Sequence, residues 1–283
     1  MSTQPNASGP RAFVIGHPIA HSRSPLIHGH WLKVHGLAGS YEKIDVAPED
    51  LDAFIGSLRA NGFVGGNVTV PHKARVLELA AAVDEAADAI GAANTLWFDD
   101  DQLIAGNTDA LGFLANLDQD APGWDTAGGS AVVLGAGGAA RAVIHGLTER
   151  GFDVALANRS FMRAVDIAEE HEEGVWAYAW EELPQLLRTA DLVVNTTSLG
   201  MEGQPPLDIK LDALKRDALV SDIVYSPLET PLLAAARARG LRTVGGLGML
   251  LHQAVPGFEH WFGVRPEVTP ELRALIEADV RDA

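Results

Sequence analysis

The chain contains no cysteine, and its 21 Lys and Arg residues are outnumbered by 38 Asp and Glu residues, which gives a formal net charge of −17. The lack of cysteine excludes disulfides, thiol nucleophiles and thiolate metal sites, and it fits a reducing compartment. The negative charge repels phosphate backbones and anionic lipid headgroups, and no local basic patch offsets it. We therefore expect no nucleic-acid or membrane partner, and an anionic substrate would have to be held by local groups.

Long apolar runs are also missing from the sequence. No run approaches the roughly 18 residues of a membrane-spanning helix, and residues 1–11 lack the hydrophobic core of a secretion signal. We therefore expect a soluble, cytoplasmic protein. Hydrophobic residues make up 47% of the chain, so nearly all of it can bury apolar surface, and only residues 1–10 are expected to be disordered. A chain of 283 residues suits two domains, since single cores tend to split beyond roughly 250 residues.

Strand-like runs alternate with helical patterns in the first half of the chain. We expect strands at residues 11–16, 41–46 and 63–70, and helices at residues 24–36, 48–62 and 72–83. Residues 93–98 and 102–107 are expected to add a hairpin to the same sheet. Strands that alternate with helices indicate a mostly parallel sheet that is covered on both faces.

A second alternating series follows the turn-rich residues 119–130. Strands that are apolar almost throughout are expected at residues 131–138, 153–159, 191–197 and 219–225, with a short fifth strand at residues 241–246 and helices between them. Two helices close the chain, at residues 248–263 and 269–282. The fold class is therefore α/β, with two α/β units in tandem.

A dinucleotide-binding fingerprint stands at the start of this second series. The strand at residues 131–134 runs into GAGGAA (residues 135–140), and a helical pattern follows. In this motif Gly135 permits a tight turn, Gly137 lets the backbone approach a pyrophosphate, and the small Ala140 lets helix and strand pack closely. The positive end of the helix would face the anion. An ordinary glycine-rich turn is the alternative on spacing alone, and the flanking strand and helix argue against it.

The next strand ends in a basic sequence that bears on the choice of cofactor. A cofactor with a free ribose hydroxyl is usually held by an acidic residue about 20 positions beyond the glycines. Here Asn158, Arg159 and Ser160 end the strand, and Arg163 follows one helical turn later. Guanidinium groups donate bidentate hydrogen bonds to phosphate oxygens, so this pattern favours NADP(H) over NAD(H). The alternative is that both arginines are solvated residues at the start of a helix.

Polar residues cluster at strand ends and turns of the first unit, where open α/β sheets bind ligands. Ser22 and Ser24 lie just before a helix, so two hydroxyls and a helix N-terminus could hold a carboxylate, with simple capping as the alternative for Ser24. Asn67 and Thr69 alternate on a strand and so share one face. Both are poor choices for a buried face unless they bind something polar.

One lysine and one aspartate of the first half are candidates for chemistry. Lys73 is expected at the start of a helix, where the helix dipole disfavours a cation, and an unfavourable charge suggests a purpose. Asp109 is expected to open a helix after Asn107 and Thr108. A surface lysine and an ordinary helix cap are the alternative interpretations of these two residues.

The motifs together resemble those of the shikimate dehydrogenase family, from Phe13 to about Phe262. The resemblance rests on motifs in the family's order and approximate spacing: HSRSP (21–25), NVTVPHK (67–73), AANT (92–95), GNTD (106–109), GAGGAAR (135–141), NRSFMR (158–163), NTTSLGM (195–201) and GLGMLLHQA (246–254). It implies an NADPH-dependent enzyme of aromatic amino-acid biosynthesis that reversibly reduces 3-dehydroshikimate to shikimate. It also implies two α/β domains that flank a cleft: a substrate-binding catalytic domain (1–109) and a Rossmann-type NADP-binding domain (110–245), with C-terminal helices (246–283) that return to the first domain.

The resemblance also implies roles for individual residues. Lys73 and Asp109 match the family's catalytic pair. Residues that match or lie near the substrate contacts are Ser22, Ser24, Asn67, Thr69, Asn94, Tyr225 and Gln253. Residues expected to contact NADP(H) are Gly135, Ala136, Gly137, Gly138, Ala139, Asn158, Arg159, Ser160, Arg163, Gly246 and Met249. One departure from the common pattern is His72, which places a titratable ring beside Lys73.

In the implied reaction, negative charge grows on the carbonyl oxygen of the substrate as it accepts a hydride. Lys73 is the candidate for donating a proton to that oxygen or for stabilising its charge, and the sequence leaves both roles open. Asp109 would favour the charged form of the lysine.

Three other functions compete with this interpretation. A quinate or quinate/shikimate dehydrogenase using NAD(P) shares the motifs, although Arg159 and Arg163 favour the NADP enzyme. A non-catalytic NADP-binding sensor would keep the fold, but both Lys73 and Asp109 are present. Metal binding is disfavoured because the histidines of the first unit form no compact ligand set. We expect a monomer or a homodimer.

Overall fold

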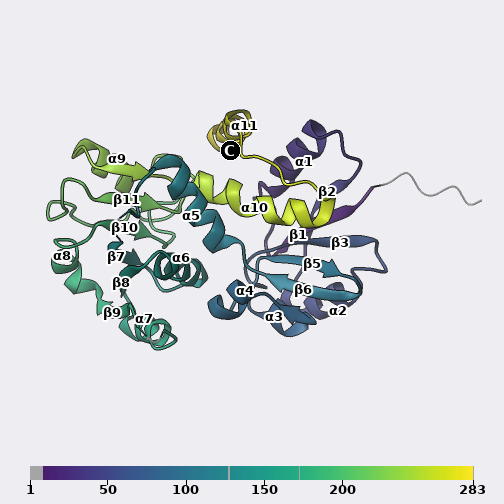
Figure 1. Cartoon of the computed structure of the whole chain (residues 1–283), viewed down its shortest axis with the longest axis horizontal. Coiled ribbons are helices and arrows are strands. Elements are labelled where there is room, and N and C mark those ends of the chain that lie inside the picture. Colours follow the sequence, from purple (N-terminus) through teal and green to yellow (C-terminus); the bar gives the residue numbers. More distant parts are fainter. Residues whose placement is uncertain (1–8, 127, 172, 283) are drawn as a thin grey trace, which may run out of the picture. The chain divides into compact units, whose positions relative to one another are not determined.

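The computed structural model describes residues 9–126, 128–171 and 173–282, and Figure 1 shows their helices and strands. The predicted disordered tail, except for Gly9 and Pro10, lies outside the described residues. Two compact units form: one contains the chain up to Thr108 together with Ala254–Leu272, and the other contains Asp109–Gln253 together with the chain from Arg273 onward. Each unit has its own six-stranded sheet, so the predicted α/β class with two sheets is confirmed. No described helix is long and apolar enough to cross a membrane.

The division differs from the predicted boundaries in two places. Asp109 groups with the second unit, whereas it was expected to end the first. The predicted C-terminal segment, residues 246–283, is shared between the units, because its central part joins the first unit and both of its ends join the second.

The first unit contains a mixed sheet with the strand order β2-β1-β3-β5-β6-β4. Its parallel half consists of β1 (Arg11–Gly16), β2 (Ser40–Asp45) and β3 (Phe63–Val68). The predicted hairpin is present as β5 (Thr95–Asp99) and β6 (Gln102–Gly106), and it pairs antiparallel with β3. The short β4 (Ala82–Val83) lies beyond β6. The helical elements between these strands are α1 (Ser24–Val34), η1 (Pro48–Asp50), α2 (Leu51–Gly56), α3 (Arg75–Leu79) and α4 (Glu85–Ile90).

The helix predicted at residues 72–83 is wrong at both ends. The observed α3 ends at Leu79, because the following backbone pairs with the hairpin: the Ala81 N–H donates to Leu103 O at 2.8 Å, and the Asp84 N–H donates to Ala105 O at 2.9 Å. A second helix, α4, then begins where none was predicted. The Asp84 carboxylate caps α4 by accepting the Ala87 N–H at 2.7 Å. The helix predicted at residues 48–62 is also shorter, since α2 ends at Gly56.

Phe13 is at the centre of the hydrophobic core of the first unit. Its ring is fully buried and meets the rings of Phe54 and Phe63 edge to face, with centroids 5.3 and 5.2 Å away. Gly66 on the adjacent β3 leaves room for this ring, since a Cβ there would lie 2.4 Å from Phe13 Cδ2. This packing fixes β3, and with it the polar residues at its end.

The second unit contains a parallel sheet with the strand order β12-β11-β10-β7-β8-β9. Its strands are β7 (Gly129–Leu134), β8 (Phe152–Asn158), β9 (Val175–Ala179), β10 (Leu192–Asn195), β11 (Leu219–Asp222) and β12 (Arg242–Val244). The helical elements before and between them are α5 (Asp109–Asp120), α6 (Gly138–Glu149), α7 (Phe161–Ala168), η2 (Trp180–Glu182), α8 (Leu183–Leu186) and α9 (Pro231–Ala238). All five predicted strands are present, and the edge strand β9 was not predicted.

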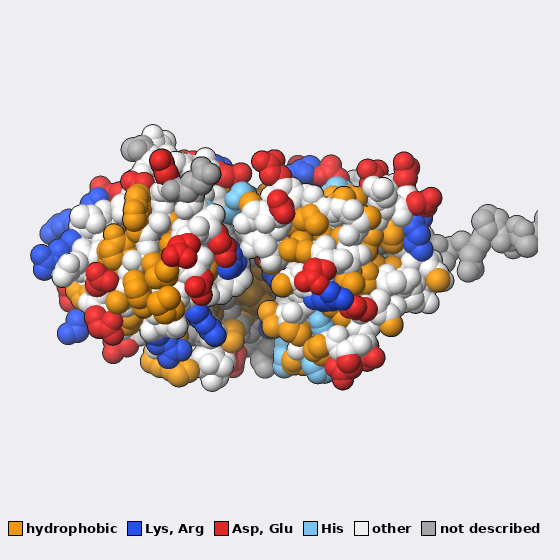
Figure 2. All heavy atoms as spheres, turned by 90° about the horizontal axis from the view of Figure 1, so that it is seen from below, with side chains coloured by type: hydrophobic (Ala, Val, Ile, Leu, Met, Phe, Trp, Pro, Cys, Tyr) orange, Lys and Arg blue, Asp and Glu red, His pale blue; other side chains and the backbone are white. Residues whose placement is uncertain are grey.

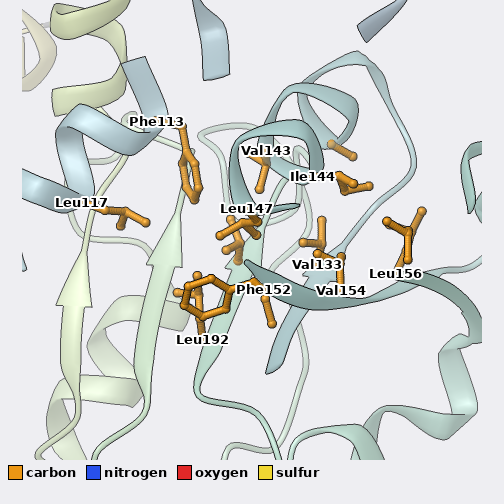
Figure 3. Packing of buried hydrophobic residues seen from close by; sticks show 14 of the residues in the cluster. Phe113, Leu117, Val133, Val143, Ile144, Leu147, Phe152, Val154, Leu156 and Leu192 are labelled. Carbon is orange, nitrogen blue, oxygen red and sulfur yellow. The ribbon is translucent and has the colours of Figure 1, made fainter. Parts of the chain in front are cut away.

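Helices α5 and α6 cover one face of this sheet. Figure 3 shows Phe113 and Leu117 of α5 and Leu147 of α6 pointing toward the strand side chains Val133 and Leu192. All of these side chains are essentially inaccessible to solvent. This burial positions the start of α6, which follows the glycine-rich turn.

Two helices close the chain, as predicted: α10 (Leu247–Phe262) and α11 (Pro270–Asp282). The C-terminal part of α10 belongs to the first unit. There Phe258 and Trp261 are buried, and the Trp261 indole donates to Leu96 O at 2.8 Å.

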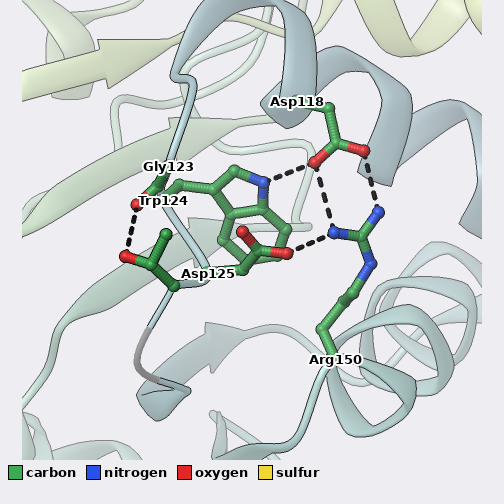
Figure 4. A network of polar contacts seen from close by, with 6 residues as sticks. Asp118, Gly123, Trp124, Asp125 and Arg150 are labelled. Carbon is green, nitrogen blue, oxygen red and sulfur yellow. Dashed lines mark hydrogen bonds and ion pairs between the residues drawn. The ribbon is translucent and has the colours of Figure 1, made fainter.

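Charge is spread over the surface and paired locally. Figure 2 shows acidic side chains scattered across one face, with Lys and Arg side chains between them. Figure 4 shows one paired group, in which Asp118 accepts hydrogen bonds from the Arg150 guanidinium and from the Trp124 indole, both at 2.8 Å. Arg150 also pairs with Asp125. The contacts attach the segment after α5 to the end of α6.

Candidate active site

The glycine-rich turn connects β7 to α6 in the second unit. Gly135 adopts a φ of +104°, which side chains rarely allow, and a Cβ there would lie 2.7 Å from Thr197 Cγ2. A Cβ on Gly137 or Gly138 would meet no atom of the described residues within 4 Å. Gly137 is the N-cap of α6 and brings no capping side chain, so the first N–H groups of the helix can bind an anion. Ala136 and Ala139 are half-buried beside this turn, and Ala140 is fully buried.

The predicted NADP-selective residues lie in the turn from β8 to α7. Asn158 ends the strand, and its Nδ2 donates to the carbonyl of Ser160, the N-cap of α7, at 2.9 Å. Arg159 and Arg163 are both exposed, and neither forms an ion pair within the described part of the chain. The neighbouring Arg141, by contrast, pairs with Glu170. Two guanidiniums are therefore available to a phosphate group.

Ser22 and Ser24 lie at the start of α1 in the first unit. Ser24 is buried and is the first residue of the helix, whereas the cap position is Arg23 and no side chain of the described residues caps α1. The interpretation of Ser24 as a simple helix cap is therefore wrong. The Ser24 N–H donates to Ser22 Oγ at 3.4 Å. This contact brings the Ser22 hydroxyl to the backbone of Ser24.

Asn67 and Asn94 are both buried and belong to one hydrogen-bond network. Asn67 Oδ1 accepts from the Tyr41 phenol at 2.6 Å, and Asn67 Nδ2 lies 3.1 Å from Asn94 O and 3.3 Å from Thr95 Oγ1. Asn94 Oδ1 in turn accepts from Thr95 Oγ1 at 2.8 Å and from the Thr108 N–H at 2.9 Å. The structure thus brings together two predicted substrate-binding residues of the first unit.

Lys73 lies in the turn that precedes α3, so it stands before the helix. Its carbonyl accepts the Ala93 N–H at 2.8 Å. The preceding His72 is 2% exposed, and its Nε2 donates to Val46 O at 2.7 Å. The His72 ring is thus buried, and its hydrogen bond to Val46 O holds the turn that contains Lys73. Thr69 directly follows β3, and its N–H donates to Ile15 O at 2.8 Å.

The remaining predicted residues belong to the second unit. Asp109 opens α5, Tyr225 follows β11, and Gln253 lies in α10; all three side chains are half-buried. Gly246 is close to the backbone after β11, since a Cβ there would lie 2.0 Å from Ile223 O. Met249 is 9% exposed and packs in the same core cluster as Phe113 and Leu147.

His17 and His28 of the first unit have separate partners. His17 Nδ1 lies 2.6 Å from Asp45 Oδ1, and His28 is buried in an aromatic cluster. Among the residues that the structure describes, no three His, Asp or Glu side chains are grouped so that they could hold a metal ion.

Comparison with known proteins identifies the family. Successive segments match the family models described as shikimate dehydrogenase substrate binding domain (14–96), shikimate / quinate 5-dehydrogenase (118–201) and shikimate 5'-dehydrogenase C-terminal domain (246–275). A shikimate dehydrogenase (NADP(+)) of Mesorhizobium japonicum is 61% identical to this chain, over 95% of the chain and 96% of the relative. The chain belongs to the shikimate dehydrogenase family. The predicted resemblance is therefore confirmed.

Solved structures show that this family fold serves more than one substrate and cofactor. A Thermus thermophilus shikimate 5-dehydrogenase in complex with NADP(H) and shikimate is 36% identical, with a TM-score of 0.84 over 96% of this chain and 99% of that chain. A Corynebacterium glutamicum quinate dehydrogenase in complex with NAD is 32% identical, with a TM-score of 0.88 over the same shares of the two chains. Within the shikimate dehydrogenase family, the fold alone therefore does not choose between these activities.

Sequence reasoning missed several buried polar residues of this family member. Asp222, at the end of β11, is fully buried and accepts hydrogen bonds from Thr230 Oγ1 at 2.7 Å and from the Val224 N–H at 3.1 Å. Burial raises the pKa of this carboxyl group. The sequence did contain a signal for Asp222, because a carboxylate within an otherwise apolar strand indicates a buried polar contact. Tyr41 offered no such signal, because its partner Asn67 is 26 residues away.

Proposed function

We propose that the chain catalyses the NADPH-dependent, reversible reduction of 3-dehydroshikimate to shikimate in aromatic amino-acid biosynthesis. The observation that carries the proposal is the presence, in one member of the shikimate dehydrogenase family, of an open glycine-rich turn and of two exposed arginines after the next strand. The turn suits a pyrophosphate, and the arginines suit a 2′-phosphate. Relatives at 61% and 58% identity, from Mesorhizobium japonicum and Methylocella silvestris, are shikimate dehydrogenases of the NADP type.

The residues present fit NADP(H) as the cofactor. The turn at residues 135–139 would hold the pyrophosphate, and Asn158, Arg159, Ser160 and Arg163 would hold the adenosine end. Gly246 and Met249 complete the proposed cofactor set. Met249 would contact the cofactor through its backbone, because its side chain is packed in the core. When bound, the reduced cofactor supplies the hydride. Because most of the proposed substrate contacts lie in residues 1–109 and most of the proposed cofactor contacts lie in residues 110–245, we assign substrate binding to the first segment and cofactor binding to the second.

Ser22 and Ser24 hold the substrate carboxylate in this proposal, with Tyr225 close to the same group. Hydroxyl groups and helix N–H groups can bind a carboxylate without a full positive charge, which suits a chain with a net charge of −17. The substrate hydroxyls are assigned to Asn67, Thr69, Asn94 and Gln253. Amide and hydroxyl side chains can both donate and accept, as a polyhydroxylated ring requires.

Lys73 and Asp109 are the proposed catalytic pair. The Lys73 ammonium stabilises charge that grows on the carbonyl oxygen, and it donates the proton that completes the hydroxyl group. Asp109 holds the lysine ammonium in place and accepts a hydrogen bond from the substrate. In the direction of shikimate oxidation, the same pair removes the hydroxyl proton.

The test is a rate matrix of shikimate and quinate against NADP+ and NAD+. We expect kcat/KM to be highest for shikimate with NADP+. A preference for quinate with NAD+ would assign the chain to the alternative activity. That alternative is tested because a quinate dehydrogenase in complex with NAD has the same fold. No reduction of either cofactor would support the alternative of a non-catalytic NADP-binding sensor.

We further propose a cytoplasmic location and a monomer or homodimer. A chain without cysteine fits a reducing compartment, and the proposed pathway uses soluble small molecules. Light scattering after size exclusion would separate a monomer of 30.0 kDa from its dimer.

A further inference from the structure

Tyr41 is bound to the proposed substrate site through its hydroxyl group. It is the second residue of β2, and its phenol donates to Asn67 Oδ1 across the sheet at 2.6 Å. Burial raises the pKa of this phenol well above its ordinary value. The group is therefore a protonated donor at neutral pH.

The Asn67 amide is held from two sides, by the Tyr41 phenol and by the Asn94 carbonyl. Asparagine can exchange its oxygen and nitrogen by a half turn, and the partners decide the orientation. A phenol that donates to Oδ1 leaves Nδ2 facing Asn94 O and Thr95 Oγ1, both acceptors. In the opposite orientation, Nδ2 would meet the phenol and Oδ1 would face a carbonyl oxygen. The Asn94 carbonyl, which can only accept, therefore selects the orientation of the Asn67 amide, and the Tyr41 phenol holds the amide oxygen with a short hydrogen bond.

The hydrogen bonds continue from the Asn67 amide through Thr95 to Asn94, a second proposed substrate-binding residue. Thr95 Oγ1 accepts from Asn67 and donates to Asn94 Oδ1 at 2.8 Å. Asn94 Oδ1 also accepts the Thr108 N–H at 2.9 Å, in the residue before Asp109. The network is buried throughout, with Asn67, Asn94, Thr95 and Thr108 each no more than 8% exposed. Buried networks of this kind are rigid only when each member is satisfied.

His28 holds the Tyr41 ring from one side. The two rings stack with centroids 4.0 Å apart and an interplanar angle of 15°, and Phe258 lies on the same histidine at 5.9 Å and 11°. His28 is completely buried, and neither ring nitrogen has a hydrogen-bond partner among the described residues. Burial lowers the pKa of His28 to about 3. The imidazole is thus an uncharged flat ring, which supports Tyr41 by its shape and adds no charge near a carboxylate site.

We propose that Tyr41 is a positioning residue for substrate: supported by His28, its phenol holds the Asn67 amide in place, and through Asn67 it orders the side chains that meet the substrate hydroxyls. This inference rests on the proposed function and adds to it a residue outside the motifs. It assigns Tyr41 an effect on shikimate affinity and none on the cofactor.

The experiment compares Tyr41→Phe with Tyr178→Phe, in which a tyrosine of the second unit loses the same oxygen atom. We expect Tyr41→Phe to raise the KM for shikimate by about 5- to 10-fold, as the loss of one well-formed hydrogen bond implies. The KM for NADP+ should stay within about twofold of wild type, because the turn that binds it is in the other unit. A KM for shikimate that matches the Tyr178→Phe control would overturn the proposal.

A double-mutant cycle tests the route through Asn67. If Tyr41 acts through that amide, adding Tyr41→Phe to Asn67→Ala should change the KM for shikimate by less than about twofold. Fully additive effects would refute the positioning role, since Tyr41 would then act independently of Asn67.

Two variants of His28 test whether Tyr41 positions the substrate site even if Tyr41→Phe does not fold. His28→Phe keeps a flat ring under Tyr41, and we expect its KM for shikimate to stay within about twofold of wild type. His28→Leu loses the flat ring and should raise that KM several-fold, with the increase in melting temperature caused by NADPH retained as the check on folding. Equal KM values in the two variants would overturn the proposal. Wild-type protein without shikimate dehydrogenase activity would instead refute the proposed function itself.

Discussion

Asn195 donates from Nδ2 to the carboxylate of Asp222 at 2.9 Å, and both side chains are fully buried between neighbouring strands of the second unit. Asn195 ends β10 and Asp222 ends β11, so the contact joins two strands at their carboxyl ends. The same Asn195 amide orders the NTT turn, because its Oδ1 accepts the Thr197 N–H at 3.0 Å and the Thr197 hydroxyl at 2.7 Å. Thr197 in turn lies against Gly135 of the cofactor turn.

Replacing Asp222 with alanine should destabilise the second unit strongly. The change leaves the buried Asn195 amide, the Thr230 hydroxyl and the Val224 N–H without their acceptor. Each such group costs about 1–3 kcal/mol, but the variant also removes the cost of burying the carboxyl group, so we expect a net loss of about 2–4 kcal/mol in the free energy of unfolding. Urea unfolding measures it, with the exposed Asp208→Ala as control. Equal midpoints in the two variants would contradict the assigned role of Asp222.

Gly138→Ala should separate cofactor binding from stability. Gly138 is the first residue of α6, and a Cβ there meets no described atom within 4 Å, so the helix should keep or slightly gain stability. The added methyl group would occupy the space by which a pyrophosphate approaches the backbone, and we expect the KM for NADP+ to rise roughly tenfold. Gly29→Ala in α1, where a Cβ also meets no described atom, is the control. A KM for NADP+ unchanged in Gly138→Ala would argue against a phosphate at this turn.

Arg159→Asp should reduce the preference for NADP+ over NAD+. The variant removes one charge-assisted contact with the 2′-phosphate and places a carboxylate where it would repel that group, so we expect kcat/KM for NADP+ to fall about 100-fold. The value for NAD+ should change far less. Arg188→Asp makes the same charge change at another exposed position of the second unit. If both variants lower the NADP+ value equally, a general effect of negative charge would explain the result.

The alternation of strands and helices could be predicted because it is local, and the errors come from contacts that are not. Residues 72–83 have strong helix propensity, but α3 ends at Leu79 because Ala81 and Asp84 pair with the hairpin more than 20 residues away. The strand β9 has an exposed Trp176 at the edge of the sheet and lacks the continuous apolar run of the central strands.

The same limit applies to the candidate site. Motif residues such as Arg159 and Gly137 are recognised because the chemistry depends on short spacing, and the structure places them in the expected turns. Tyr41 meets Asn67 only because β2 and β3 both pair with β1, and that register is not visible in either strand alone. The role of Asn116 is equally hidden: it is 1% exposed and donates to Gly245 O, 129 residues away, at 2.9 Å.

His28 should make the protein sensitive to acid. The pKa of His28 is about 3 in the folded protein, whereas an exposed histidine in the unfolded chain has a pKa of 6.5. Between these two values, the unfolded chain therefore binds a proton at His28 that the folded chain does not. The stability present above pH 6.5 is therefore lost as the pH falls toward 3, by about 2 kcal/mol at pH 5. His28→Phe should remove this part of the loss, measured as unfolding free energy at pH 7 and pH 5. The exposed His35→Phe should not, and equal slopes in both variants would contradict a buried neutral His28.

Lys73 variants can separate proton donation from charge stabilisation. Lys73→Ala removes both and should lower kcat by about 10²- to 10⁴-fold, with the affinity for NADPH unchanged and with Lys33→Ala in α1 as the control. Lys73→Arg keeps the positive charge, but a guanidinium stays charged near neutral pH and is therefore a poor proton donor. If proton donation dominates, Lys73→Arg should be nearly as slow as Lys73→Ala; if charge stabilisation dominates, much of kcat should return. Wild-type kcat in Lys73→Ala would remove this residue from the mechanism.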